Sequence, residues 1–169
     1  MKLDLRTLRE RHPRLLPETA AILAVNAAVA LERRHEPDVE MTAHAFGTEG
    51  AATVSWERAA EGAPLMLDAN VVTELGAEAL ALTLVHETRG WVARRRLQRG
   101  EFADWLMTAP DGKVVALEVS GTDAGDHEAR MRQKLLQVAK CVAGKTLAAC
   151  VVSFLQPSIA AKEVLTAFL

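Results

Sequence analysis

The chain has 169 residues, of which 50% are hydrophobic and 25% are charged, with ten Gly and six Pro. These values exclude a disordered or low-complexity chain, and the length predicts one domain, or at most one domain with an appendage. A formal net charge of −2 gives no overall attraction to nucleic acid, although a local basic stripe is enough to contact phosphates.

Residues 1–16 carry charges throughout and lack the apolar stretch of a secretory signal. The longest apolar run, near residues 20–31, spans about a dozen residues, which is too short for a membrane helix. We therefore expect a cytoplasmic protein without a membrane partner. Cys141 and Cys150 have no companion ligands, so we expect buried, reduced thiols.

The first part of the chain predicts a helix and a hairpin. Residues 1–16 form a basic arm with helical character, and a helix then runs from Pro17 to about Arg34, because proline suits a first helical turn. Two alternating runs, VEMTAHAF and AATVSWERA, flank a glycine-bounded turn and predict a β-hairpin. We assign residues 1–65 to an N-terminal helix-and-hairpin appendage.

Residues 66–169 predict an α/β core that packs with the appendage into one compact domain. Asp68 or Asn70 caps a helix over residues 71–87, and Gly90 marks its end. Three short extended runs follow, namely WVARRRLQ, ADWLMTAP and KVVALEVSG. The second and third runs are joined by a turn that contains Pro, Asp and Gly.

A second helix is expected over residues 128–143. The run LAACVVSFLQP after it is continuously apolar, which is typical of a strand buried on both faces. A short C-terminal helix is expected to close the chain. The predicted order of the core is therefore helix, three strands, helix, strand.

Two acids stand out on the second and third strands. Strand alternation places Glu118 on one face with Ala116 and Ser120, where a carboxylate is costly to bury unless it is paired or binds a metal. Asp104 opens the preceding strand, and the hairpin turn brings it beside Glu118. Two carboxylates on adjacent strands form the hard-oxygen site that Mg²⁺ or Mn²⁺ prefers, and such a metal polarises phosphate and activates water. The open alternative is a pair of strand-end acids neutralised by arginines.

The order of elements, with an Asp opening one strand and Glu-x-Ser on the next, resembles the PD-(D/E)XK nuclease superfamily, which has the restriction-endonuclease-like fold. The resemblance covers the core and leaves the appendage unexplained. It implies that Asp104 and Glu118 are the metal-binding acids of the family. It also implies that Glu78 matches an acid some members carry on the first helix, with Glu74 as the rival, and that Gln137 matches a Gln on the later helix.

The motif lysine of that family would fall at position 120, where this chain has Ser120. Some members carry the lysine on the following helix instead. That helix places two stripes on different sides: Arg130, Lys134, Gln137 and Cys141 on one, and the core-facing Met131, Leu135, Val138 and Val142 on the other. Lys134 is therefore the candidate for a relocated lysine, with Arg130 second, and the open alternative is a solvated helix charge.

Five arginines lie on or near the first predicted strand, at Arg89, Arg94, Arg95, Arg96 and Arg99. On a regular strand Arg94 and Arg96 share one face and Arg95 takes the other. Arginine suits phosphates, and Trp91 or Trp105 could stack a base. Arg94, Arg96, Arg130 and Ser120 are the candidate nucleic-acid contacts. The alternative is an edge strand whose charges pair with acids and oppose aggregation.

Together these features predict a divergent Mg²⁺- or Mn²⁺-dependent nuclease that hydrolyses phosphodiester bonds in DNA or RNA; its resemblance also suggests a defence or mobile-element system. The catalytic set would be Asp104, Glu118, Lys134, Glu78 and Gln137, with the first two as metal ligands. The rival interpretation is a catalytically inactive nuclease-like subunit that binds nucleic acid, a protein partner or a second copy of the chain.

Overall fold

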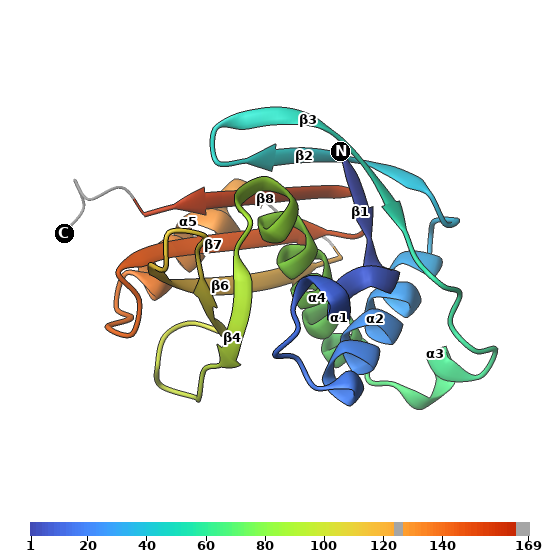
Figure 1. Cartoon of the computed structure of the whole chain (residues 1–169). Coiled ribbons are helices and arrows are strands. Elements are labelled where there is room, and N and C mark those ends of the chain that lie inside the picture. The colour runs from blue at the N-terminus through green and yellow to red at the C-terminus, as the bar shows by residue number, and fades with distance from the viewer. Residues whose placement is uncertain (124–126, 165–169) are drawn as a thin grey trace.

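The computed structural model describes residues 1–123 and 127–164, which form a mixed α/β fold (Figure 1). Within these residues a single eight-stranded sheet runs in the order β1-β3-β2-β8-β7-β6-β5-β4, so β4 lies at one edge. Its strands are β1 (Lys2–Asp4), β2 (Val39–Ala45), β3 (Thr48–Ser55), β4 (Val92–Arg96), β5 (Trp105–Thr108), β6 (Val114–Thr122), β7 (Thr146–Ser153) and β8 (Ser158–Glu163). In this part of the chain no helix has the length and apolar character needed to cross a membrane.

The N-terminal segment joins the sheet, so the predicted helical arm is wrong for its first residues. β1 pairs in parallel with β3, and only then do the short 3-10 helix η1 (Leu5–Thr7) and α1 (Leu8–Arg11) follow. The reason is hydrophobic: Leu3, Leu5 and Leu8 are all buried, and a strand followed by a tight turn places all three in the core.

The predicted helix and hairpin are both present. α2 (Pro17–Glu32) starts at the proline and packs against α4 (Ala69–Arg89), where Gly76 allows close approach because a Cβ there would lie 3.1 Å from the Cα of Ala27. β2 and β3 pair antiparallel around a turn formed by Phe46 and Gly47, both with positive φ. β2 also pairs in parallel with β8, so the hairpin and the predicted core share one sheet.

The order α4, β4, β5, β6, α5 (His127–Val138), β7 agrees with the predicted order of the core. Asp68 caps α4 by accepting hydrogen bonds from the amides of Asn70 and Val71, and Gly90 ends it in the left-handed conformation, at φ 65°. α5 ends earlier than predicted, so Val142 is 99% exposed and does not belong to a core-facing stripe.

A strand, β8, stands where a C-terminal helix was predicted. It pairs antiparallel with β7 and parallel with β2, and its central residues are buried between these neighbours. The short helix α3 (Ala63–Met66) precedes α4 in the chain.

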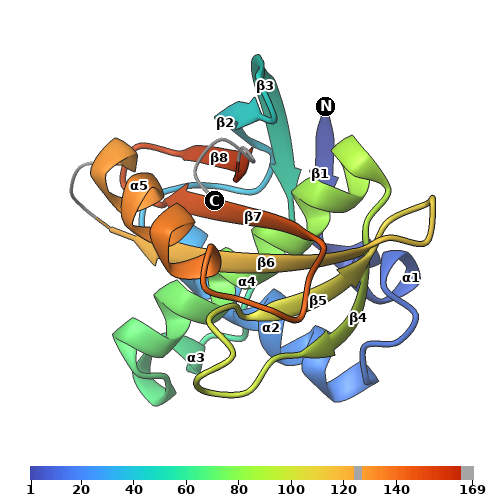
Figure 2. The ribbon, with the colours of Figure 1, turned by 90° about the vertical axis from the view of Figure 1, so that its left-hand side faces the viewer.

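β6 lies between two helices, because α5 covers one side of the sheet and α4 the other (Figure 2). Leu117, Val119 and Gly121 face α4, and the approach at Gly121 is so close that a Cβ would lie 2.3 Å from the carbonyl oxygen of Thr73. The alternate residues of β6, which include Glu118, face α5. The fold thus places Glu118 under α5.

Candidate functional site

Glu118 is the centre of the candidate site. Its side chain is almost fully buried in the middle of β6, and the ammonium Nζ of Lys134 donates a hydrogen bond to its Oε1 at 2.5 Å. Lys134 in turn donates to the Oε1 of Gln137 at 3.2 Å, and its side chain remains 20% exposed. Lys134 and Gln137 lie three residues apart on α5, so both can face the same strand. The structure therefore brings together the acid and the candidate lysine.

Asp104 joins this site from the residue before β5. Its amide donates to the carbonyl of Leu117 at 3.1 Å, and its Oδ2 accepts from the amide of Val119 at 2.8 Å. The side chain is thereby fixed across β6 at the level of Glu118. Because these two bonds go to the residues on either side of Glu118, Asp104 lies next to Glu118 on the neighbouring strand.

Burial raises the pKa of Glu118 to about 7. The charge of Asp104 acts in the same direction, whereas Lys134 opposes it. The ammonium of Lys134 thus neutralises the buried Glu118, while a second acid, Asp104, lies on the neighbouring strand. Such an arrangement favours either a shared proton or a further cation.

A divalent cation fits the donor set of these two acids. The Oε2 of Glu118 is buried and accepts no hydrogen bond within the described residues. Mg²⁺ is commonly held by one or two carboxylates, with waters and substrate phosphates completing its shell. Across residues 1–123 and 127–164, however, no three His, Cys, Asp or Glu side chains gather closely enough to hold a metal alone. The fit is therefore to a two-carboxylate site that substrate completes.

A second donor pair lies next to Glu118 on the same face. The guanidinium of Arg130 donates to the hydroxyl of Ser120 at 2.9 Å, and also lies 3.4 Å from the carbonyl of Gly121. Ser120 occupies the position of the expected motif lysine, and Arg130 supplies a positive charge there from α5. Arg130 and Lys134 are one turn apart, so two cations reach adjacent positions of β6 from one helix.

Glu78 lies on the other face of the sheet, although it was predicted to share the site. Its carboxylate accepts from the indole of Trp105 at 2.9 Å and from Arg96 at 2.5 Å. Burial raises its pKa to about 7, and the charge of Asp104 adds to this effect, while Arg96 and Trp105 oppose it. Its rival Glu74 is exposed on α4. Glu78 therefore interacts with the site only through the electrostatic effect of the Asp104 charge.

The arginines of β4 are distributed over the two faces of the sheet differently from the prediction. A bulge between Ala93 and Arg95 shifts the register, so Arg96 pairs with Trp105 and shares the face of Ala93. Arg94 lies in the bulge and is exposed, and the predicted common face for Arg94 and Arg96 is wrong because it assumed a regular strand. Arg95 lies on the opposite face and pairs with Glu101. Arg96 is held by Glu78, which leaves Arg94 as the freer candidate for phosphate contact.

Neither tryptophan suggested for base stacking can serve, because Trp91 and Trp105 are both buried. The exposed aromatic ring beside the site is Phe102, which sequence reasoning missed. Its position two residues before Asp104, in a short loop that follows Gly100, is the signal that could have identified it.

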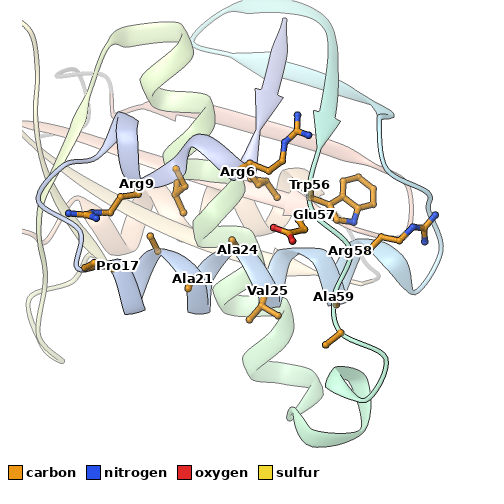
Figure 3. A pocket seen from close by; sticks show the side chains of 14 residues that line it. Arg6, Arg9, Pro17, Ala21, Ala24, Val25, Trp56, Glu57, Arg58 and Ala59 are labelled. Atoms are coloured by element: carbon orange, nitrogen blue, oxygen red, sulfur yellow. The ribbon is translucent and has the colours of Figure 1, made fainter.

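A pocket of about 410 Å³ opens elsewhere, among η1, α1, α2 and the segment after β3 (Figure 3). Its floor is formed by small side chains of α2 such as Ala21 and Ala24, and Figure 3 shows Arg9 and Arg58 at opposite ends of it. None of the candidate catalytic residues lines this pocket. The pocket is therefore separate from the acid pair.

Comparisons with protein-family models, with curated proteins and with solved structures gave no match to this chain.

Proposed function

We propose that the protein is a divergent metal-dependent nuclease that hydrolyses phosphodiester bonds in DNA or RNA. The observation that carries this proposal is the buried Glu118, which lies next to Asp104 of the neighbouring strand and accepts a hydrogen bond from Lys134 of the following helix. A carboxylate pair of this kind is unfavourable for folding alone, because burial and the charge of Asp104 raise the pKa of Glu118. Its retention in the core is accounted for if the pair binds a cation and, through it, a phosphate.

In this proposal Asp104 and Glu118 hold Mg²⁺ or Mn²⁺, and the bound ion supplies positive charge to the scissile phosphate. The Oε2 of Glu118, which has no donor among the described residues, is the atom that such an ion would satisfy. The amide of Val119 donates a hydrogen bond to Oδ2 of Asp104 and so fixes the orientation of this carboxylate.

Hydrolysis forms a bond from a water oxygen to phosphorus, breaks one P–O ester bond, and moves a proton from water to the departing sugar oxygen. Lys134 is positioned to neutralise the negative charge that develops on the phosphate, since its ammonium already lies at Glu118 and is partly open to solvent. Gln137 accepts from this ammonium and orients it. Arg130, with Ser120, would hold an adjacent phosphate by charge-assisted hydrogen bonds.

The superfamily resemblance is supported by two features. The observed order from α4 to β7 is the order that the resemblance implies. In addition, the ammonium that reaches Glu118 comes from α5, which is where a relocated motif lysine was expected. These features favour a nuclease in which Lys134 replaces the missing lysine at Ser120.

The test is cleavage of plasmid DNA, single-stranded DNA and RNA with Mg²⁺, Mn²⁺ or EDTA. We expect metal-dependent cleavage that Glu118→Gln abolishes and Lys134→Gln reduces by about 100-fold or more. Glu40→Gln, an exposed acid on β2, is the matched control and should cleave like the natural chain. Cleavage that survives in Glu118→Gln, or no cleavage of any substrate with either metal, would refute the proposal.

A binding subunit without catalytic activity is the second candidate. The observation that favours it is the ion pair itself, because Lys134 already neutralises Glu118 and stabilises the site without any metal. It predicts that the natural chain binds nucleic acid equally in Mg²⁺ and in EDTA and cleaves under neither condition. Equal binding without cleavage would select this candidate over the nuclease.

A further inference from the structure

The loop from β4 to β5, residues 97–104, has a well-defined hydrogen-bonded structure beside the acid pair. The amide of Leu97 donates to the carbonyl of Asp104 at 2.8 Å, which closes the base of the loop. Glu101 accepts two hydrogen bonds from Arg95, at 2.8 and 3.1 Å, and one from the amide of Gln98. Leu97 is also buried against the end of α5. These contacts hold the backbone of the loop and the side chains of Leu97 and Glu101 in place.

Phe102 in this loop is exposed and has an unfavourable backbone conformation. Its φ is +63°, which L side chains rarely adopt, and 44% of the residue is open to solvent. Phe46 also has a positive φ, but it lies in the tight turn of the β2–β3 hairpin and its ring packs on Trp91 at 5.1 Å. The Phe102 residue therefore remains partly open to solvent, whereas the ring of Phe46 packs on Trp91. Such strain is found where a side chain contacts a ligand.

A cation accompanies the ring. The Nζ of Lys140 lies 5.9 Å from the centroid of Phe102, and Lys140 lies two residues after the end of the helix that carries Lys134 and Gln137. Lys140 itself is exposed. A partly exposed aromatic ring next to an exposed positive charge matches a nucleotide, whose base is aromatic and whose phosphate is anionic.

Phe102 also lies close to the acid pair along the chain. Two residues span at most about 7 Å, so Phe102 and Asp104 lie within one short step of each other. A base stacked on Phe102 would thus belong to a nucleotide whose own or neighbouring phosphate can reach the acids. A base inside a duplex has both faces covered by its neighbours, whereas an unpaired base offers a free face to the ring.

From these contacts we infer that Phe102 and Lys140 form a stacking platform for an unpaired base, so that the substrate is single-stranded or locally unpaired nucleic acid. This inference rests on the proposed function, because it takes the phosphate at Asp104 and Glu118 from that proposal.

Binding is measured by fluorescence anisotropy with a labelled single-stranded oligonucleotide and with a blunt duplex of the same sequence, both in EDTA so that no cleavage occurs. Phe102→Asn removes the ring, while asparagine tolerates the left-handed backbone. We expect this variant to bind the single strand about tenfold more weakly and the duplex within about twofold of the natural chain. Leu155→Asn, which replaces a turn residue of similar exposure (40%), is the control and should leave both affinities unchanged.

A second readout comes from Phe102→Trp, which keeps a stacking ring. Trp56, Trp91 and Trp105 are all buried, so the added indole is the most exposed one in the chain. Its emission should fall when the single-stranded oligonucleotide is added and should change little with the duplex. Affinity for the single strand should match or exceed that of the natural chain.

The outcomes separate this inference from the nuclease proposal. Equal weakening of single-strand and duplex binding by Phe102→Asn, or no weakening of either, overturns the stacking platform even if the protein cleaves. Absence of oligonucleotide binding by the natural chain overturns it as well. Selective loss of single-strand binding supports the platform, and if cleavage is absent in that case only the nuclease proposal fails.

Discussion

His12 gives the sharpest test of the packing at the N-terminus. It lies at the end of α1, is fully buried, and uses both ring nitrogens. Nδ1 accepts from the amide of Ala93 at 3.0 Å, which places the proton on Nε2, 3.1 Å from the carbonyl of Leu82. The neutral imidazole thereby connects α1 with α4 and with the edge strand β4.

The consequence is a loss of stability in acid. Burial lowers the pKa of His12 from 6.5 to about 4, and the charges of His86 and Arg11 act in the same direction, against the hydrogen bond to Leu82. The unfolded chain therefore binds this proton at a higher pH than the folded chain does. The stabilisation is complete above pH 6.5 and is lost as the pH falls toward 4. At about 1.4 kcal/mol per pH unit, this interval predicts a loss of about 3 kcal/mol.

The assay is urea unfolding of the natural chain and of His12→Asn between about pH 7.5 and pH 4.5. At pH 7.5 we expect the variant to be less stable by about 2 kcal/mol, because it leaves the carbonyl of Leu82 without its donor. That difference should shrink steadily below pH 6.5, since only the natural chain has this proton to bind. His44→Asn, an exposed histidine on β2, should keep the pH dependence of the natural chain. Parallel curves for the natural chain and His12→Asn would refute the argument.

Two further changes test the close packing and the buried acid on α4. Gly121→Ala should lower the free energy of unfolding by about 2 kcal/mol or more in urea titrations, because its Cβ would lie 2.3 Å from a backbone oxygen of α4. Gly50→Ala, where nothing lies within 4 Å of the added Cβ, is the control and should leave the free energy of unfolding unchanged. Glu78 has a pKa raised from 4.5 to about 7, mainly by burial, so its contribution favours folding at low pH and is lost as the pH rises through 7. Glu78→Gln should therefore be more stable than the natural chain by about 2 kcal/mol near pH 8 and equally stable near pH 4.5. A variant that is less stable near pH 8 would show that the ion pair outweighs the burial.

The order of the central elements could be predicted because it depends on local patterns. Each of these patterns determines the structure of residues close to it in the sequence: the apolar run forms β7, Asp68 starts α4, and the glycine after α4 ends it. β1 and β8 could not be predicted in this way. Both are short, and β8 gains its strand conformation from pairing with β2 and β7 on its two sides. Their structure is set by partners far away in the sequence.

Half of the candidate site follows from sequence spacing alone. A tight hairpin brings Asp104 beside Glu118, and the one-turn spacing on α5 brings Lys134 toward the same strand. The faces of Arg96 and Glu78 could not be derived in this way. A one-residue bulge moves Arg96 to the α4 side of the sheet, and the rotation of α4 about its axis is set by close packing at glycines of its own and of β6.

The separation of Glu78 from Glu118 defines what each acid can do. Each is buried on a different face of the sheet and each meets a different cation, Arg96 from β4 or Lys134 from α5. Glu78 nevertheless holds the indole of Trp105, and this residue directly follows Asp104 in the chain. In the proposed nuclease, Glu78 therefore acts as a positioning residue that fixes the start of β5, and through one peptide bond it fixes the acid that would share a metal with Glu118.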